Sequence, residues 1–239
     1  MQRNASISEY PLLHRLNTFY EKIDIILDGK TLEECASLKS LGMLIDNKTQ
    51  WTAHINDIIR KVNYKLSTIS QISKFCSYEN SKMLVTATCY SLLRYCAIIW
   101  GTAKRGDLYN IDKCIKRCAR LVLKKSKNDS VFSELASLGW FSAQNLYNYS
   151  VCMFAFSVIN NICPPYFNNL VVKKESQYSL RFPYHIQTQH TLPIHKYSCN
   201  LISVTSCKLW NNLPKELVED DYLPLFKHKL KTYILSLQN

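Results

Sequence analysis

The feature that most constrains the fold of this chain is a change in the spacing of its apolar residues at Trp51. Over Trp51–Ile72, large apolar residues recur every three or four positions and form one stripe along a helix. Similar spacing returns over Leu108–Lys125, over Ser142–Ile162 and over Phe226–Leu237. The chain is therefore predicted to be mainly α, built from helices that bury one face against their neighbours.

The residues before Trp51 contain the only clear β signals. Apolar residues alternate along Ile23–Leu27, and the Asp28-Gly29 step that follows favours a tight turn because glycine adopts a positive φ without strain. A second strand is expected over Leu38–Ile45, with Gly42 inside it as a bulge or a point of close backbone approach. These patterns predict a small amino-terminal β-hairpin.

The segment Ser81–Trp100 is apolar on nearly all sides, and Arg94 is its only charge after Met83. A helix of this kind is either buried at the centre of a domain or spans a membrane. The apolar run is about 18 residues, the lower limit for spanning. Because Arg94 and several hydroxyl groups would be costly in lipid, a central buried helix is the favoured interpretation, and no membrane partner is expected.

The ten cysteines do not indicate a disulfide scaffold, since a chain of 239 residues can bury a core without one. The amino terminus leads into no apolar signal-peptide core, so we expect an intracellular protein, nuclear or cytoplasmic rather than secreted, with reduced thiols. The spacing of His190, His195 and Cys199, with His185 and Cys207 nearby, partly fits a zinc site. No C-x-x-C pair accompanies it, so no metal site is assigned.

Positive charge is concentrated in one stretch of the chain. The whole sequence has 30 Lys and Arg against 18 Asp and Glu, a net charge of +12. Residues 51–127 contain fifteen basic and four acidic residues, whereas residues 1–50 and 128–239 are close to neutral. A stretch this positive attracts polyanions, so nucleic acid is the expected class of partner.

One predicted helix within this stretch presents a row of cations. They follow one another at i, i+4, i+7, i+11 and i+14, and are Lys113, Arg117, Arg120, Lys124 and Lys127. Like charges one turn apart repel one another, which favours contact with an anion over a merely solvated face. We expect these residues, together with Arg60 and Lys61 on an earlier helix, to contact the phosphate backbone of RNA or DNA without reading its sequence.

Several short motifs occur in a fixed order from Ile23 to the carboxyl end. They are Leu41-Gly42, Trp51 with His54-Ile55, Tyr95–Gly101, Ile115–Arg120, Leu138-Gly139-Trp140, Leu209–Pro214 and Phe226-Lys227. The ordered set resembles the region that follows the catalytic palm motifs in reverse transcriptases of LINE-like (non-LTR) retrotransposons. Two positions depart from the family pattern, with Ser40 where an aromatic residue is often found and Cys96 where alanine is common.

The resemblance implies a domain organisation and a function. Residues 1–50 would be a remnant of the polymerase palm, residues 51–127 a basic, thumb-like helical region, and residues 128–239 a helical carboxyl-terminal region with a loop-rich insert. Leu41 and Gly42 match a strand near the primer terminus, where glycine permits close approach of a backbone. The intact parent would be an RNA-directed DNA polymerase.

The resemblance also implies which part of the catalytic apparatus is missing. Polymerases of this family need paired aspartates that hold two Mg²⁺ ions, which activate the primer 3′-oxygen and stabilise the leaving pyrophosphate. In the family, these aspartates lie in a turn that would come before Ile23, and this chain has no pair of aspartates there. Glu219–Asp221 lies in a late loop and is interpreted as a solvated charge run. We therefore expect a chain without a cofactor of its own that binds nucleic acid but does not polymerise alone.

Two further interpretations stay open. The chain could be a transposon remnant adopted by its host as a protein-interaction module, or a relic without function. A nucleophilic enzyme is not indicated, because no spacing suggests a Ser-His-Asp or Cys-His pair. Tyr90, Tyr95 and Trp100 could stack on bases, but their helical spacing favours positions in the core. The oligomeric state is not indicated by the sequence.

Overall fold

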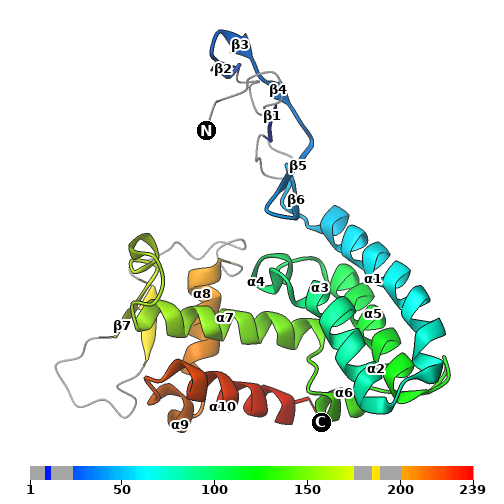
Figure 1. Cartoon of the computed structure of the whole chain (residues 1–239). Helices are drawn as coiled ribbons and strands as arrows, with labels where there is room; N and C mark the ends of the chain where they lie inside the picture. The colour runs from blue at the N-terminus through cyan, green and yellow to red at the C-terminus, as the bar shows by residue number, and fades with distance from the viewer. Residues whose placement is uncertain (1–8, 12–23, 175–184, 189–200, 239) are drawn as a thin grey trace.

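The computed structural model describes residues 9–11, 24–174, 185–188 and 201–238, and it is mainly helical, as predicted (Figure 1). The helices are α1 (Thr52–Ile72), the 3₁₀ turn η2 (Ser73–Phe75), α2 (Tyr78–Val85), the π-helix η3 (Thr86–Tyr90), α3 (Ser91–Arg94), α4 (Ala97–Trp100), α5 (Arg105–Leu123), α6 (Glu134–Leu138), α7 (Ala143–Ile159), the 3₁₀ turn η4 (Pro165–Phe167), α8 (Ile202–Asn211), α9 (Lys215–Val218) and α10 (Leu223–Ser236). The strands are β1 (Glu9–Tyr10), β2 (Ile26–Leu27), β3 (Lys30–Thr31), β4 (Glu33–Glu34), β5 (Ser37–Ser40), β6 (Met43–Asp46), β7 (Val171–Lys173) and β8 (Ile186–Thr188).

The amino-terminal strands form two-stranded pairs that extend away from the helices (Figure 1). The predicted turn at Asp28-Gly29 is confirmed, since it joins the antiparallel strands β2 and β3. Both residues have positive φ, 51° and 76°, as a tight hairpin turn requires. In addition, β1 pairs with β4 in parallel, which the sequence did not indicate.

The predicted strand Leu38–Ile45 is wrong, because the chain turns back on itself at its centre. Strands β5 and β6 are antiparallel, with Ser40 opposite Met43. Leu41 and Gly42 form the turn between them, with φ of 47° and 84°. Two successive residues with positive φ fit a two-residue hairpin turn, and glycine adopts this conformation without strain. The resemblance to the polymerase implied that Leu41 and Gly42 lie inside a strand. They lie instead in the turn between β5 and β6.

Helix α1 confirms the stripe predicted after Trp51. Its buried residues follow the helical period and are His54, Ile55, Ile58, Val62, Leu66 and Ile69. Ile72, the last predicted member, is half exposed at the carboxyl end of the helix. The Asp46 carboxylate fixes the start of α1, because it accepts the backbone N–H groups of Lys48, Gln50 and Trp51 at 3.0–3.1 Å.

The helix predicted over Ser81–Trp100 is confirmed as far as Arg94, because α2, η3 and α3 follow one another without a gap, but it is wrong beyond that residue, where α4 is a separate helix. The helix is interrupted after α3 at Tyr95 and Cys96, and Cys96 has a φ of 51°. Three hydroxyl groups donate to the carbonyl four residues earlier, a bond that bends helices, and they belong to Thr86, Thr88 and Ser91. The indole of Trp100 donates to the Tyr95 carbonyl at 2.9 Å, a hydrogen bond that spans the interruption between α3 and α4.

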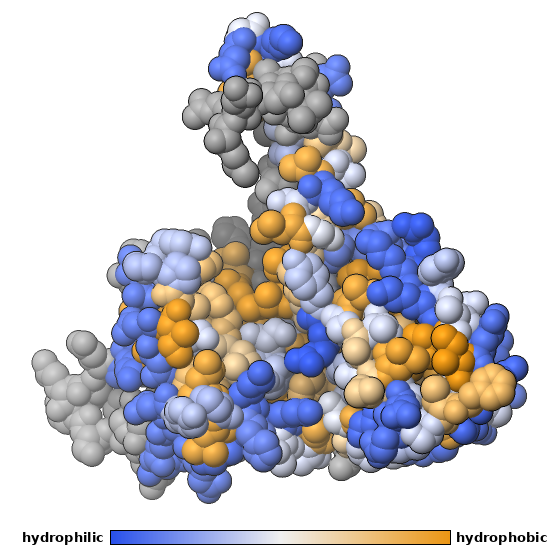
Figure 2. Space-filling view, viewed as in Figure 1, coloured by the Kyte–Doolittle hydropathy of each residue, from blue (hydrophilic) through white to orange (hydrophobic). Residues whose placement is uncertain are grey.

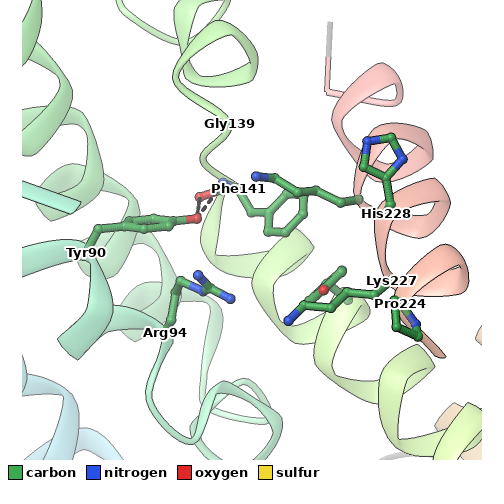
Figure 3. A pocket seen from close by; sticks show the side chains of 9 residues that line it. Tyr90, Arg94, Gly139, Phe141, Pro224, Lys227 and His228 are labelled. Atoms are coloured by element: carbon green, nitrogen blue, oxygen red, sulfur yellow. Dashed lines mark hydrogen bonds between the residues drawn. The ribbon is translucent and has the colours of Figure 1, made fainter. Parts of the chain in front are cut away.

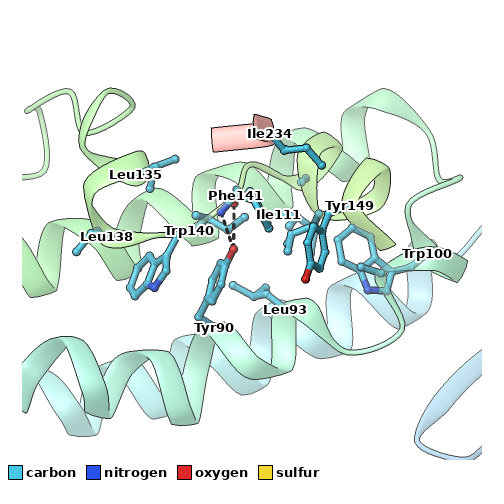
Figure 4. Close-up of a cluster of buried hydrophobic side chains, with 14 of the residues drawn as sticks. Tyr90, Leu93, Trp100, Ile111, Leu135, Leu138, Trp140, Phe141, Tyr149 and Ile234 are labelled. Carbon is cyan, nitrogen blue, oxygen red and sulfur yellow. Dashed lines mark hydrogen bonds between the residues drawn. The ribbon is translucent and has the colours of Figure 1, made fainter. Parts of the chain in front are cut away.

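The centre of the molecule is a cluster of buried aromatic and aliphatic side chains (Figure 4). Tyr90 stacks on Trp140, with ring centroids 4.9 Å apart. The Tyr90 hydroxyl also accepts the backbone N–H of Phe141 at 2.6 Å. Tyr90 and Trp100 are core residues, as predicted, whereas Tyr95 is 49% exposed. The cluster has members on both sides of residue 128, so the second and third predicted parts share a core.

The carboxyl-terminal helices pack around α7, which confirms the helix predicted over Ser142–Ile162. Helix α10 lies along α7 and buries Phe226, Leu230 and Ile234. Asn211 at the end of α8 pairs its side-chain amide with both backbone groups of Ile186 in β8, at 2.9 and 3.0 Å. Most of the predicted loop-rich insert lies outside the described residues. Within the described part of the chain, no helix has the length and apolar character needed to cross a lipid bilayer.

Candidate nucleic-acid interface

Most of the predicted cations lie on two neighbouring helices, α1 and α5, that run in the same direction. At their amino ends, the Thr52 hydroxyl of α1 donates to the Asp107 carboxylate of α5 at 2.8 Å. About three turns later, Arg117 Nη1 of α5 donates to Asn63 Oδ1 of α1 at 3.2 Å. Because both contacts join the two helices at matching positions, α1 and α5 form a parallel pair. Figure 2 shows hydrophilic side chains along the outer edge of the body, where α1 runs.

Lys113 and Arg117 are exposed on α5 and form no ion pair with any described residue. The Lys113 ammonium lies 4.3 Å from the ring centre of Tyr109, a cation–π contact within one turn. Arg117 uses one nitrogen on Asn63 and keeps its remaining donors available. These two side chains are the part of the predicted row that the helix holds outward and unneutralised.

The predicted continuous face from Lys113 to Lys127 is wrong at its carboxyl end. Helix α5 ends at Leu123, and Lys124 has a φ of 51° as the residue that caps it. Lys127 therefore lies in the turn beyond the helix and not on its face, although it is exposed. Arg120 donates from Nε to the Asp129 carbonyl at 3.0 Å, so part of its guanidinium holds this turn in place.

Arg60 and Lys61 share one carboxylate. Asp57 accepts from Arg60 at 2.7 Å and from Lys61 at 2.5 Å. The hydrogen bonds from Lys61 and then Arg60 lower the pKa of Asp57, which is therefore ionised at neutral pH. The three residues together contribute one net positive charge, so this part of the surface is less positive than the sequence alone suggests. Both cations remain accessible, with Arg60 the more exposed.

Leu41 and Gly42 lie against the break in the helical segment. The Leu41 carbonyl accepts the Tyr95 hydroxyl at 2.6 Å, and the Tyr95 ring lies 3.7 Å from the position of a Cβ on Gly42. The Leu41 side chain is 89% exposed. The turn is therefore tied to the helical body through Tyr95, and its leucine side chain faces outward.

Two exposed tyrosines lie near the cations and were not predicted from the sequence. Tyr64, one turn after Arg60 on α1, is 77% exposed, and Tyr109 on α5 is 57% exposed. Both lie off the apolar stripes of their helices, which was the signal available in the sequence. Flat aromatic faces beside cations suit a single strand, since bases stack on them without sequence preference.

The acidic and zinc-like clusters give no metal site in the described residues, where no group of three or more His, Cys, Asp or Glu side chains could hold an ion. Asp220 pairs with Lys229 at 2.7 Å and is largely shielded from solvent, so the interpretation of this run as solvated is wrong at that residue. His190, His195 and Cys199 lie outside the described residues. His185 and Cys207 are described and belong to no such group.

The chain was compared with protein-family models, curated proteins and solved structures, and none of them matches it.

Proposed function

We propose that this chain is the post-catalytic, thumb and carboxyl-terminal part of a LINE-like reverse transcriptase, and that it binds nucleic acid through its cationic helices. The bound feature is the phosphate backbone of RNA or DNA, contacted without sequence preference. The part lacks the aspartates of the polymerase site, so it positions a strand and performs no nucleotidyl transfer by itself. Mg²⁺ belongs to the intact parent enzyme.

The observation that supports binding is the outward, unneutralised placement of Lys113 and Arg117 beside α1. Within the described residues, neither side chain forms an ion pair with a carboxylate. Exposed cations on a rigid pair of helices are the usual means of contacting phosphates. The neighbouring tyrosines Tyr64 and Tyr109 add surfaces on which unpaired bases can stack.

The contacts among the motif residues support the resemblance. Leu41 is joined to Tyr95, and Tyr95 is joined to Trp100, although the first two are 54 residues apart. His54 Nδ1 accepts the backbone N–H of Leu44 at 3.4 Å. Motifs that recur in a fixed order are expected to be the joints of one fold, and these residues occupy such joints.

Binding is tested with the double variant K113E/R117E and a fluorescent single-stranded RNA at low salt. We expect the affinity of the variant to fall at least tenfold, because two favourable phosphate contacts become repulsive. Reversing Arg117 with Arg120 would be less informative, since Arg120 also supports the turn after α5. Fluorescence anisotropy gives the dissociation constants directly.

The matched control is K174E/K208E, which makes the same change of charge at two exposed lysines away from α1 and α5. Near-normal affinity in this control shows that position matters and not only total charge. Equal losses in both double variants, or no binding by the unaltered chain, would contradict the proposal. Circular dichroism confirms that both variants are folded.

A protein-interaction module is the second candidate, and one feature of the surface favours it. Large apolar side chains are exposed where α1 ends and α2 begins, at Ile72, Phe75, Tyr78 and Met83. Figure 2 shows hydrophobic side chains gathered over this end of the helical body. Phe75 is 92% exposed, and a group of large exposed apolar side chains is typical of a surface that contacts another protein. Absence of RNA and DNA binding at low salt would favour this candidate over the first.

A further inference from the structure

A second cationic site lies outside the proposed interface, in a cavity of about 350 Å³ where several elements of the chain meet. The carboxyl end of α3 supplies Arg94, the segment after α6 supplies Gly139 and Phe141, and α7 and α10 complete the wall. The size lies in the range of small-molecule sites. None of the nine lining residues is acidic.

The cavity combines an aromatic wall with a cationic rim. Tyr90, Phe141 and Tyr149 are buried and form the wall, with Phe141 and Tyr149 ring centres 5.1 Å apart. Arg94 and Lys227 extend toward one another from opposite sides of the opening (Figure 3). This arrangement suits a ligand with one flat, apolar part and one strongly anionic part.

The cations of the rim have no counter-charge in the described part of the chain. Arg94, Lys227 and Lys231 enter no ion pair or hydrogen bond there. Burial, followed by the positive charges of Arg94, Lys82 and Lys227, lowers the pKa of Lys231. Cations that repel one another destabilise the free protein, and a bound anion removes that penalty.

Two further details adapt the cavity to an anion. A Cβ on Gly139 would lie 3.2 Å from Lys231 Nζ, so the absence of a side chain there leaves room for the ammonium. Tyr149 is 8% exposed, and its hydroxyl has no hydrogen-bond partner among the described residues. Because Tyr149 lines the cavity, this hydroxyl can donate to a ligand that enters it.

We propose that this cavity binds the phosphate group of a nucleotide, with Arg94, Lys227 and Lys231 on the phosphate oxygens and the base against the aromatic wall. Tyr149 donates a further hydrogen bond to the ligand. The nucleotide is either a free molecule or the phosphorylated end of a strand, since both present the same chemistry. The inference depends on the cavity alone and not on the interface of α1 and α5.

The test measures binding of AMP, of adenosine and of inorganic phosphate by calorimetry at constant ionic strength. We expect AMP to bind more tightly than either fragment, because it fills both the cationic and the aromatic parts of the site. The variant R94Q/K231Q should weaken AMP binding at least tenfold, since it removes two charge-assisted contacts. Y149F, which lacks only the hydroxyl, should weaken it by a smaller factor.

The controls separate this site from the first. R94Q/K231Q should keep a thermal stability equal to or above that of the unaltered chain, because it removes repulsion, whereas a merely structural role would lower it. K113E/R117E should bind AMP normally. K174Q/K208Q should leave the affinities for both RNA and AMP unaltered. Failure of K113E/R117E to lose RNA affinity would contradict the proposed function without affecting the cavity.

A short oligonucleotide with a 5′-phosphate, titrated into K113E/R117E, distinguishes the two sources of the nucleotide. Tighter binding of the oligonucleotide than of AMP assigns the cavity to the end of a strand, and the reverse order assigns it to a free nucleotide. The proposal is overturned if neither ligand binds at millimolar concentration. It is also overturned if R94Q/K231Q binds AMP as well as the unaltered chain does.

Discussion

Asp46 and His54 show how single side chains join the amino-terminal hairpin to the helices. The Asp46 carboxylate accepts three backbone N–H groups in the turn before α1. The imidazole of His54, buried on α1, accepts a backbone N–H from β6. Apolar periodicity does not indicate either contact, because both are made by polar side chains. The contact of His54 involves Leu44 in β6, the strand after the turn at Leu41-Gly42, which periodicity placed inside a strand.

Replacing Asp46 by alanine should lower the free energy of unfolding by about 1–2 kcal/mol, because backbone N–H groups in the turn lose a charged hydrogen-bond acceptor. The physical reason is that three backbone donors lose their common acceptor at the start of α1. Urea denaturation followed by circular dichroism measures the change. Asp24→Ala, at an exposed position of the same region, should leave stability unaltered, and an equal loss in both variants would contradict this role for Asp46.

His54 should make stability depend on pH. Burial is the main cause that lowers its pKa below the ordinary value of 6.5, and Lys61 lowers it further against an opposing effect of Asp57. The unfolded chain therefore binds a proton at a higher pH than the native chain does. Native stability is fully present above pH 6.5 and falls as the pH drops below that value.

The variant His54→Gln keeps a polar side chain but cannot be protonated in this range. The stability difference between the two proteins should be constant above pH 7 and should shift in favour of the variant as the solution is acidified. Denaturation at a series of pH values between about 8 and 5 measures this difference. A difference that does not vary with pH would show that His54 titrates equally in both states.

At the scale of elements, helices with one apolar stripe were predictable and the central segment was not. The stripe after Trp51 gave α1 almost to the residue, because periodicity reports directly which face is buried. Ser81–Trp100 is apolar all round, so periodicity could not locate its break. The break at Cys96 has no glycine or proline to mark it. It is held by contacts of Tyr95 with Leu41 and Trp100, which only the tertiary structure supplies.

The end of α5 illustrates the same limit for the cationic row. Counting turns extended the row to Lys127, because the sequence has no glycine where the helix stops. Lys124 takes the left-handed conformation instead, and in a residue other than glycine this conformation destabilises the fold. Asp129 then folds back, with its carbonyl on Arg120 and its carboxylate on the Ser126 N–H. The row is therefore two parts, one on the helix and one beyond it.

Lys124→Gly should raise the free energy of unfolding by about 1 kcal/mol, because glycine adopts the left-handed conformation without strain. The same change removes one cation and should weaken RNA binding slightly. Lys124→Ala is the control, since it removes the charge without relieving the strain. Thermal denaturation should separate the two variants, while anisotropy should give them similar affinities. Equal stability of the two would contradict the strain at Lys124.

At the scale of the whole molecule, charge and core are organised separately. The hydrophobic cluster joins α1–α5 to α7 and α10, so residues 51–127 do not pack by themselves. The cations of α1 and α5 face outward from this shared core, and a second cationic group surrounds the cavity beside α10. The excess charge of residues 51–127 was visible in the sequence, but Arg94 was separated from Lys227 and Lys231 by more than a hundred residues. Only folding brings these three cations to one opening.

The most direct measurement is the salt dependence of RNA affinity for the unaltered chain and for K113E/R117E. Each phosphate contact on a single strand contributes about 0.7 to the slope of log affinity against log salt concentration. We expect the slope of the double variant to be shallower by about 1.4, the value for two lost contacts. An identical slope in the two proteins, or an affinity of the unaltered chain that does not vary with salt, would contradict this expectation.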